Sequence, residues 1–330
     1  LTIMSGISYG LASVFPALVG IGVAALLSFS LTNGIVPETI TDALFGIAMA
    51  AVGMLSIVGM VISNDAYGPI VDNARGLVEM ANLGDRALDI TDELDSAGNT
   101  VKAITKGFAI GAAGLTVISL LGAFMAEAND VLGAHAMALI KGFDVMNPRV
   151  FFGLLVGSAV PAVFSAMLML GVNRNAERLV DEIHRQFKQI KGLKEGKADP
   201  EYDRCITIAT EGALKELIPA GAMAIAVTFA VGFIGGIPAV GGFLAGNIVS
   251  GLLLALFMSN AGGLWDNAKK LVESGSFGGK GSAAHKAAVI GDTVGDPCKD
   301  TAGPSINTQI TVVSLVASLA VGLFALFSLF

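Results

Sequence analysis

The chain has 330 residues, of which 54% are hydrophobic and only 14% are charged, and its mean hydropathy is +0.73. A typical soluble domain carries about 25% charged residues, so this composition excludes an ordinary soluble protein and indicates an integral membrane protein. The net charge of −7 is concentrated in a few polar segments, and we expect no nucleic-acid partner. Cys205 and Cys298 lie far apart and predict neither a disulfide framework nor a metal site.

Seven apolar stretches are long enough to span a bilayer, which takes about 20 helical residues. These expected spans are 11–31, 43–63, 107–127, 150–172, 217–237, 241–259 and 308–328. None shows the alternation of a membrane β-barrel, so each is predicted to be a helix, although Pro219 interrupts the fifth. The predicted fold is an all-α helix bundle forming one membrane domain over 1–330. Because the chain begins at Leu1 in the middle of apolar sequence, we expect it to be a piece of a longer protein.

The connections between the spans differ in their basic residues. Segments 32–42, 128–149 and 235–240 hold two, whereas segments 64–106, 173–204 and 260–299 hold seventeen. Basic residues favour the cytoplasmic side of a membrane, so we place the last three segments in the cytoplasm. Leu179, Ile183, Phe187 and Ile190 recur at helical spacing, which predicts that the fourth span continues into the cytoplasm as an amphipathic helix. Several helices are expected to project past the bilayer in this way.

The first cytoplasmic segment contains Asp65, Asp72 and Glu79 at seven-residue intervals, close to one face of a helix. A solvated helix end would explain such acids. Asp72, however, lies just beyond an apolar span, where acids are costly and usually functional. The following stretch, Asp85–Asp95, is expected to be a solvated acidic loop without a catalytic role.

Two polar residues precede the third span. Asn99 offers an oxygen that can bind a hard cation. Lys102, three residues later, can place its ammonium group where a monovalent cation would otherwise bind.

The last cytoplasmic segment alternates acids with lysines. Asp266 precedes Lys269 and Lys270 by three and four residues, which a helix-stabilising ion pair would explain. Asp292, Asp296 and Asp300 stand at i, i+4 and i+8, so a helix would align them on one face, where they repel unless cations lie between them. Together with Lys299 they offer carboxylates for Mg²⁺ and ammonium groups for phosphate. No Walker A or Rossmann fingerprint is present, so the sequence predicts a Mg²⁺–polyphosphate site built from side chains.

Four stretches closely resemble the membrane-integral pyrophosphatases, the ion pumps driven by inorganic pyrophosphate. They are Asp65-Ala-Tyr-Gly-Pro-Ile-Val-Asp72-Asn73-Ala, Gly98-Asn99-Thr100, Gly262-Gly-Leu-Trp-Asp266-Asn-Ala-Lys269-Lys270 and His285-Lys-Ala-Ala-Val-Ile-Gly-Asp-Thr-Val-Gly-Asp-Pro-Cys-Lys-Asp-Thr-Ala-Gly-Pro-Ser305. The resemblance covers the whole chain in order and corresponds to the last seven of the sixteen helices of that family.

The resemblance implies a role for each matching residue. Asp72, Asn99, Asp266, Asp292 and Asp296 would be Mg²⁺ ligands, and Lys269, Lys270 and Lys299 would bind pyrophosphate. Asp300 would be one of two acids that hold the attacking water. Its partner belongs to an earlier motif, Asp-Val-Gly-Ala-Asp, which this sequence does not contain, so we expect the chain alone to be inactive.

The resemblance also implies a subclass and a setting. Lys102 and Thr105 match the K⁺-independent members, in which lysine replaces K⁺ and H⁺ is favoured over Na⁺ as the pumped ion. We expect a homodimer in a prokaryotic inner membrane, with the site facing the cytoplasm. Three positions depart from the family pattern: Arg75 is commonly glycine, Cys298 is commonly Phe or Leu, and Thr311 stands where many members carry a gate lysine.

Two other functions remain open at this point. A secondary cation transporter would use the acids as an ion pathway, but transporter sites usually lie near mid-bilayer, whereas these acids and lysines are expected at one membrane face. A non-catalytic membrane scaffold would leave the acid-and-lysine segments without a purpose.

Overall fold

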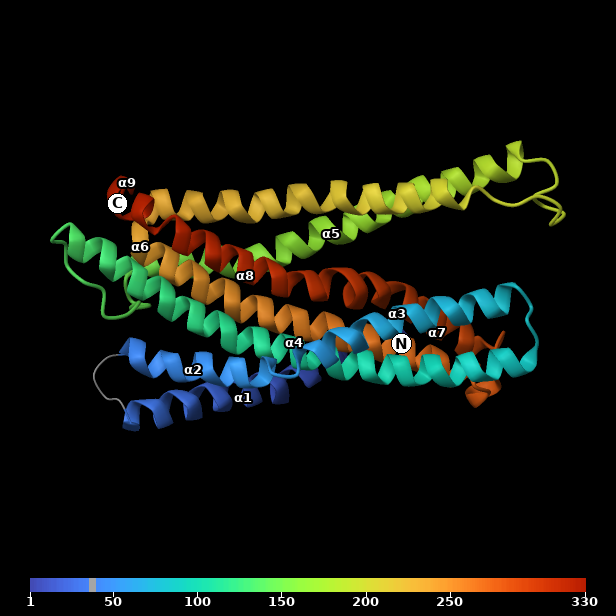
Figure 1. Ribbon diagram of the computed structural model, residues 1–330, viewed down its shortest axis with the longest axis horizontal. Helices are drawn as coiled ribbons and strands as arrows, with labels where there is room; N and C mark the ends of the chain where they lie inside the picture. Colours follow the sequence, from blue (N-terminus) through green and yellow to red (C-terminus); the bar gives the residue numbers. More distant parts are fainter. Residues whose placement is uncertain (36–39) are drawn as a thin grey trace.

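The computed structural model describes the backbone of residues 1–35 and 40–330; the side chains at 34–35, 40–43, 65, 99–100 and 102–103 lie outside the description. Within these ranges every regular element is a helix, which confirms the all-α class. The elements are α1 (Thr2–Ile35), α2 (Ile40–Leu55), α3 (Val58–Met80), α4 (Asp85–Ala134), α5 (Pro148–Gln189), α6 (Tyr202–Glu273), the 3₁₀ turn η1 (Ser276–Gly278), α7 (Ala283–Asp296), the π-helix η2 (Pro297–Ala302), α8 (Gly303–Leu319) and α9 (Val321–Phe327). The long helices run along the long axis of the molecule (Figure 1).

Four described helices are long and apolar enough to cross a membrane, or up to six if each of two bent helix pairs counts as one span. α6 covers two of the seven expected spans. It is divided into two halves at Gly236, where the backbone leaves the helical region (φ 64°, ψ −165°). Glycine adopts this conformation without steric cost, and Pro238 then lies in the first turn of the second half, where a missing N–H is tolerated. The chain reverses direction between the two halves, drawn yellow and orange in Figure 1. The total of seven spans stays a prediction.

The helices are longer than the bilayer requires. α4 and α5 have 50 and 42 residues, or roughly 75 and 63 Å at about 1.5 Å per residue, against about 30 Å of hydrocarbon. α5 continues to Gln189, which confirms the helical continuation of the fourth expected span. Its place on the cytoplasmic side stays a prediction.

The expectation of a loop at Asp85–Asp95 is wrong, because this stretch forms the first three turns of α4. Gly84, with a φ of 92°, turns the chain into the helix, and Asp85 lies in the first turn. Acids near a helix N-terminus are stabilised by the positive end of the helix dipole. An acid-rich stretch in this position therefore forms a helix rather than a solvated loop.

Glycines bring α5 and the second half of α6 into close contact. A Cβ atom at Gly157 would lie 2.0 Å from the carbonyl oxygen of Phe243, and one at Gly242 would lie 1.9 Å from that of Val150. Gly153 and Gly246 extend the same contact by one turn on each helix. Small residues four apart on both helices are a common device for packing helices in lipid. Large apolar side chains on the outer face of α1, such as Phe15 and Leu26, are exposed, as expected for a chain in lipid.

Candidate functional site

A buried lysine lies among four carboxylates where α6 meets α7 and η2. Lys299 is 6% exposed. Its Nζ donates a 2.5 Å hydrogen bond to Oδ2 of Asp266 and lies 2.9 Å from Oδ1 of Asp296. Asp292 Oδ1 and Asp300 Oδ2 lie 3.7 and 3.8 Å from the same nitrogen. The predicted face of three acids therefore surrounds a cation, together with a fourth acid from α6.

Lys269 is the second cation of this site. It pairs with Asp292 and lies 3.6 Å from Oδ1 of Asp266. Asp266 and Asp292 are 6% and 7% exposed, and buried carboxylates are stable only when they are paired. The two lysines and the acids around them, here called the Lys299 cluster, bring together six of the residues predicted from the sequence: Asp266, Lys269, Asp292, Asp296, Lys299 and Asp300.

Small residues allow this cluster to form. A Cβ atom at Gly262 would lie 2.5 Å from Cβ of Lys299 and 2.7 Å from the carbonyl oxygen of Gly295. One at Gly291 would lie 2.7 Å from the ring of Trp265, whose Nε1 donates to the carbonyl oxygen of Thr2. The glycines of both motifs therefore let α7 lie directly against α6, which explains why Gly262 and Gly291 belong to the same sequence patterns as the charged residues.

The donor set fits a hard divalent cation in part. Oδ1 of Asp266 and Oδ1 of Asp292 are buried without a hydrogen-bond partner, and such oxygens are the ligands that Mg²⁺ prefers. Among the described side chains, however, no three His, Cys, Asp or Glu residues are grouped closely enough to hold a metal ion. The predicted ligand Asn99 lies outside the described side chains.

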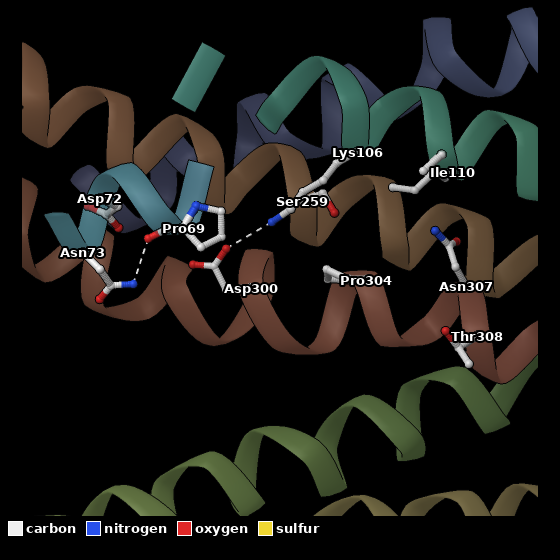
Figure 2. A pocket seen from close by; sticks show the side chains of 11 residues that line it. Pro69, Asp72, Asn73, Lys106, Ile110, Ser259, Asp300, Pro304, Asn307 and Thr308 are labelled. Carbon is white, nitrogen blue, oxygen red and sulfur yellow. Dashed lines mark hydrogen bonds and ion pairs between the residues drawn. The ribbon is translucent and has the colours of Figure 1, made fainter. Parts of the chain in front are cut away.

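Asp72 and Asp300 line a common cavity of about 630 Å³ beside the cluster. Lys106, Ser259 and Asn307 also line it, so the walls come from α3, α4, α6, η2 and α8 (Figure 2). Asp72 is thus placed near the predicted water-holding acid.

Lys106 is a site residue that the sequence analysis missed. Its Nζ donates a 2.6 Å hydrogen bond to the carbonyl oxygen of Lys299 and lies 3.0 Å from Oδ1 of Asp300. The signal in the sequence was its place one helical turn after Lys102, which puts both on one face of α4. Between them, Thr105 is 5% exposed and donates to the carbonyl oxygen of Val101; the Lys102 side chain is among those not described.

The chain matches the sequence profile of the family described as Inorganic H+ pyrophosphatase over residues 1–320. It belongs to this family. The resemblance drawn from the four motifs is thereby confirmed, and neither the secondary transporter nor the scaffold is favoured.

Relatives in this pyrophosphatase family include both ion types. A K(+)-insensitive pyrophosphate-energized proton pump of Chloroflexus aurantiacus is 47% identical over 96% of this chain and 41% of its own length. A putative K(+)-stimulated pyrophosphate-energized sodium pump of Clostridium tetani is 48% identical over 96% of this chain and 46% of its own. A K(+)-insensitive proton pump of Methanosarcina mazei is 46% identical over the same shares. The chain thus spans about half the length of these relatives, and overall identity does not separate proton from sodium pumps.

One predicted substrate lysine has its hydrogen-bond partner outside the Lys299 cluster in this member of the family. Lys270 donates a 2.6 Å hydrogen bond to Oδ2 of Asp95 on α4. Asp95 is 3% exposed, so it is not the solvated acid that its acidic neighbourhood suggested. The sequence gives no sign of this pair, because the two residues are 175 positions apart.

Proposed function

We propose that this chain is part of a membrane pyrophosphatase that hydrolyses inorganic pyrophosphate to two phosphates and couples hydrolysis to proton transport out of the cytoplasm. The observation that carries the proposal is the Lys299 cluster, where ammonium groups and carboxylates alternate at the end of apolar helices. Metal-bound pyrophosphate needs both kinds of group, and family membership supports the same chemistry.

Mg²⁺ is the proposed cofactor, held by Asp72, Asn99, Asp266, Asp292 and Asp296. Oδ1 of Asp266 and Oδ1 of Asp292 support this assignment, because they lie within ion-pair distance of a lysine but accept no hydrogen bond. When bound, Mg²⁺ would neutralise charge on pyrophosphate and make the bridging bond easier to break. Lys269 and Lys299 are proposed to bind phosphate oxygens, giving up part of their present contacts with the carboxylates.

Asp300 is proposed to hold the attacking water and to accept its proton. Its side chain is 41% exposed and faces the cavity of about 630 Å³. Lys106 contacts one carboxylate oxygen and Lys299 approaches the other. These two lysines keep the carboxylate oriented between the phosphate-binding residues and the cavity.

Coupling to ion transport is proposed to run along the helix that carries Asp300. α7, η2 and α8 follow one another without a break from Ala283 to Leu319. A change in the contacts of Asp300 can therefore be transmitted along this helix to Thr311, which lies three turns beyond Asp300 and near the start of the expected span 308–328. Thr311 Oγ1 donates to the carbonyl oxygen of Asn307.

The ion and the setting of the pump belong to the same proposal. Lys102 and Thr105 support a K⁺-independent proton pump. Proton and sodium pumps are similarly identical to this chain, so the choice of ion rests on these two residues. We further propose that the pump is a homodimer in a prokaryotic inner membrane, with the Lys299 cluster facing the cytoplasm.

The test is made with the full-length pump in inside-out membrane vesicles. Phosphate release from pyrophosphate that depends on Mg²⁺ and acidifies the vesicle interior is the expected result. Ion uptake driven by a membrane potential without hydrolysis would instead favour a secondary transporter.

A further inference from the structure

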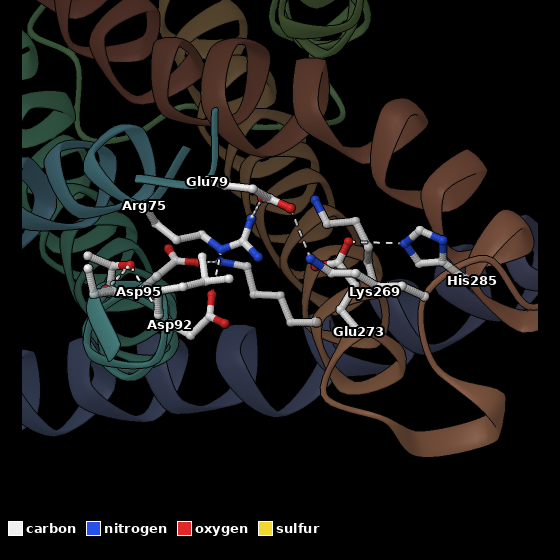
Figure 3. A network of polar contacts seen from close by, with 12 residues as sticks. Arg75, Glu79, Asp92, Asp95, Lys269, Glu273 and His285 are labelled. Carbon is white, nitrogen blue, oxygen red and sulfur yellow. Dashed lines mark hydrogen bonds and ion pairs between the residues drawn. The ribbon is translucent and has the colours of Figure 1, made fainter. Parts of the chain in front are cut away.

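A second cavity, of about 350 Å³, lies among charged residues of α3, α4 and α6 and the loop that follows α6. Figure 3 shows the network around it, with Asp92 and Asp95 of α4 near Arg75 of α3. Asp95 is the most buried acid of this network, at 3% exposed. Its Oδ2 accepts the hydrogen bond from Lys270, whereas its Oδ1 is buried without a partner. The proposed hydrolysis gives no task to this acid.

Burial determines what Lys270 can do. A buried carboxylate that loses its paired cation is strongly destabilising. In the Lys299 cluster the proposed Mg²⁺ would take the place of lysine contacts that are given up. Asp95 is not among the proposed Mg²⁺ ligands, so moving Lys270 onto a phosphate group would leave it uncompensated. Lys269, one position earlier, contacts the acids of the Lys299 cluster instead. The adjacent lysines therefore have different partners on different helices.

The Asp95–Lys270 pair joins the two helices that carry proposed metal ligands. Asn99 lies one turn after Asp95 on α4, and Lys102 lies two turns after it, so all three share one helix face. On α6, Asp266 lies one turn before Lys270. Fixing Lys270 on Asp95 thus fixes this part of the α4 backbone against the last turns of α6, next to Asp266.

We propose that Asp95 is a positioning residue of the hydrolytic site, whose buried carboxylate holds Lys270 and thereby sets the position of Asn99 and Lys102 relative to the Lys299 cluster. The inference rests on the proposed function and adds a residue to it. In this arrangement Lys270 acts through Asp95, and Lys269 and Lys299 bind the substrate.

A neighbouring ion pair provides a matched control. Asp92, one turn before Asp95 on α4, pairs with Arg75 at 2.6 Å and lines the same cavity. The Asp92 side chain is 49% exposed, and exposed pairs contribute little. Asp92→Asn should therefore leave hydrolysis within about twofold of the wild type.

The experiment compares Asp95→Asn, Asp95→Leu, Lys270→Met and the double variant Asp95→Leu/Lys270→Met in the full-length pump. Each single variant should raise the half-saturating Mg²⁺ concentration about tenfold, as loss of a ligand-orienting contact does. A second readout is the rise in thermal unfolding midpoint that Mg²⁺ alone produces, which the single variants should reduce. The double variant should recover most of both properties, because an apolar pair often replaces a buried ion pair without loss.

Three outcomes would overturn the proposal. Asp95→Asn could keep wild-type Mg²⁺ dependence and Mg²⁺ stabilisation. The double variant could be as impaired as Lys270→Met, which would show that the substrate itself requires Lys270. All Asp95 variants, the double included, could fail to fold, which would make the pair a purely structural one. Absence of hydrolysis by the wild-type pump would instead refute the proposed function.

Discussion

Lys299 and Asp266, which are 33 positions apart, form a buried 2.5 Å hydrogen bond between η2 and α6. This contact joins the two motifs that carry most of the charged residues of the site. It also shows that a single ammonium group balances acids from both helices, so each residue of the Lys299 cluster depends on the others.

Replacing Lys299 with methionine should reduce hydrolysis by about 100-fold or more, because a positioned charge on the transferring phosphate is lost. The variant should also unfold at a lower temperature, since Asp266 loses its closest partner. Initial rates of phosphate release and a thermal unfolding curve check both effects. Lys215→Met is the control, because Lys215 is 70% exposed in a 3.6 Å pair with Glu211. Equal behaviour of the two variants would contradict the assignment.

Asp300→Asn should lower hydrolysis by about 10²–10⁴-fold, because an amide cannot accept the proton of the water. Membrane insertion and the unfolding temperature should stay near those of the wild type, since the Asp300 side chain is 41% exposed. Near-normal turnover in a phosphate-release assay would refute the role of Asp300.

Lys106→Met tests whether Lys106 acts through Asp300. The single variant should lower kcat about tenfold, whereas in an Asp300→Asn background it should cause little further loss. Independent, multiplying effects in this double-mutant cycle would mean that the contact between the two side chains is irrelevant to turnover.

Asp292→Asn should raise the Mg²⁺ concentration required for half-maximal hydrolysis, by about tenfold or more. Oδ1 of Asp292, which accepts no hydrogen bond, is one of the oxygens proposed to bind the metal. Chelation with EDTA should abolish wild-type hydrolysis, and added Mg²⁺ should restore it. An unchanged Mg²⁺ requirement in the variant would remove Asp292 from the ligand set.

K⁺ should change wild-type activity little, because the ammonium group of Lys102 is proposed to replace this ion. Lys102→Ala should be less active without K⁺ and should be stimulated several-fold when K⁺ is added. The measurement compares hydrolysis in K⁺-free buffer with hydrolysis after K⁺ is added to about 50 mM. The Na⁺ concentration is held constant. Several-fold activation of the wild type by K⁺ would contradict the subclass.

Gly157→Ala should destabilise the protein by about 1–3 kcal/mol, because its Cβ would lie 2.0 Å from the Phe243 carbonyl oxygen. Gly221→Ala is the matched control, since a Cβ atom there meets nothing within 4 Å. This variant should not be destabilised, because alanine costs less conformational entropy in a helix than glycine does. Thermal unfolding in detergent compares the two. The close helix contact would be unsupported if both variants unfolded alike.

The sequence could predict the all-α class and most of the Lys299 cluster because these depend on local patterns. Apolar length determines a span, and charged residues three or four apart share a helix face. The break within α6 at Gly236 falls in segment 235–240, which the sequence predicts as a connection, although the expected fifth span itself runs to 237.

What could not be predicted depends on contacts between distant helices. The Asp95–Lys270 pair and the contacts of Lys106 with Lys299 and Asp300 arise only when α4 packs against α6 and η2. The acidic neighbours of Asp95 along the chain predict a solvated side chain, but its burial is determined by residues that are distant in the sequence and close in space. The ends of the helices cannot be predicted either, since an apolar sequence does not mark the membrane boundary.

The π-helix η2 changes how positions along this helix correspond to directions in space. Each residue of an α-helix turns the chain by about 100°, and a wide π turn accommodates one more residue than an α turn does. Compared with a continuous α-helix of 3.6 residues per turn, the side chains after Ala302 are therefore shifted by one position relative to those before Pro297. Tightening that turn would rotate α8 about its own axis by roughly the angle of one residue, and Thr311 would then face a different neighbour while the backbone stayed helical throughout.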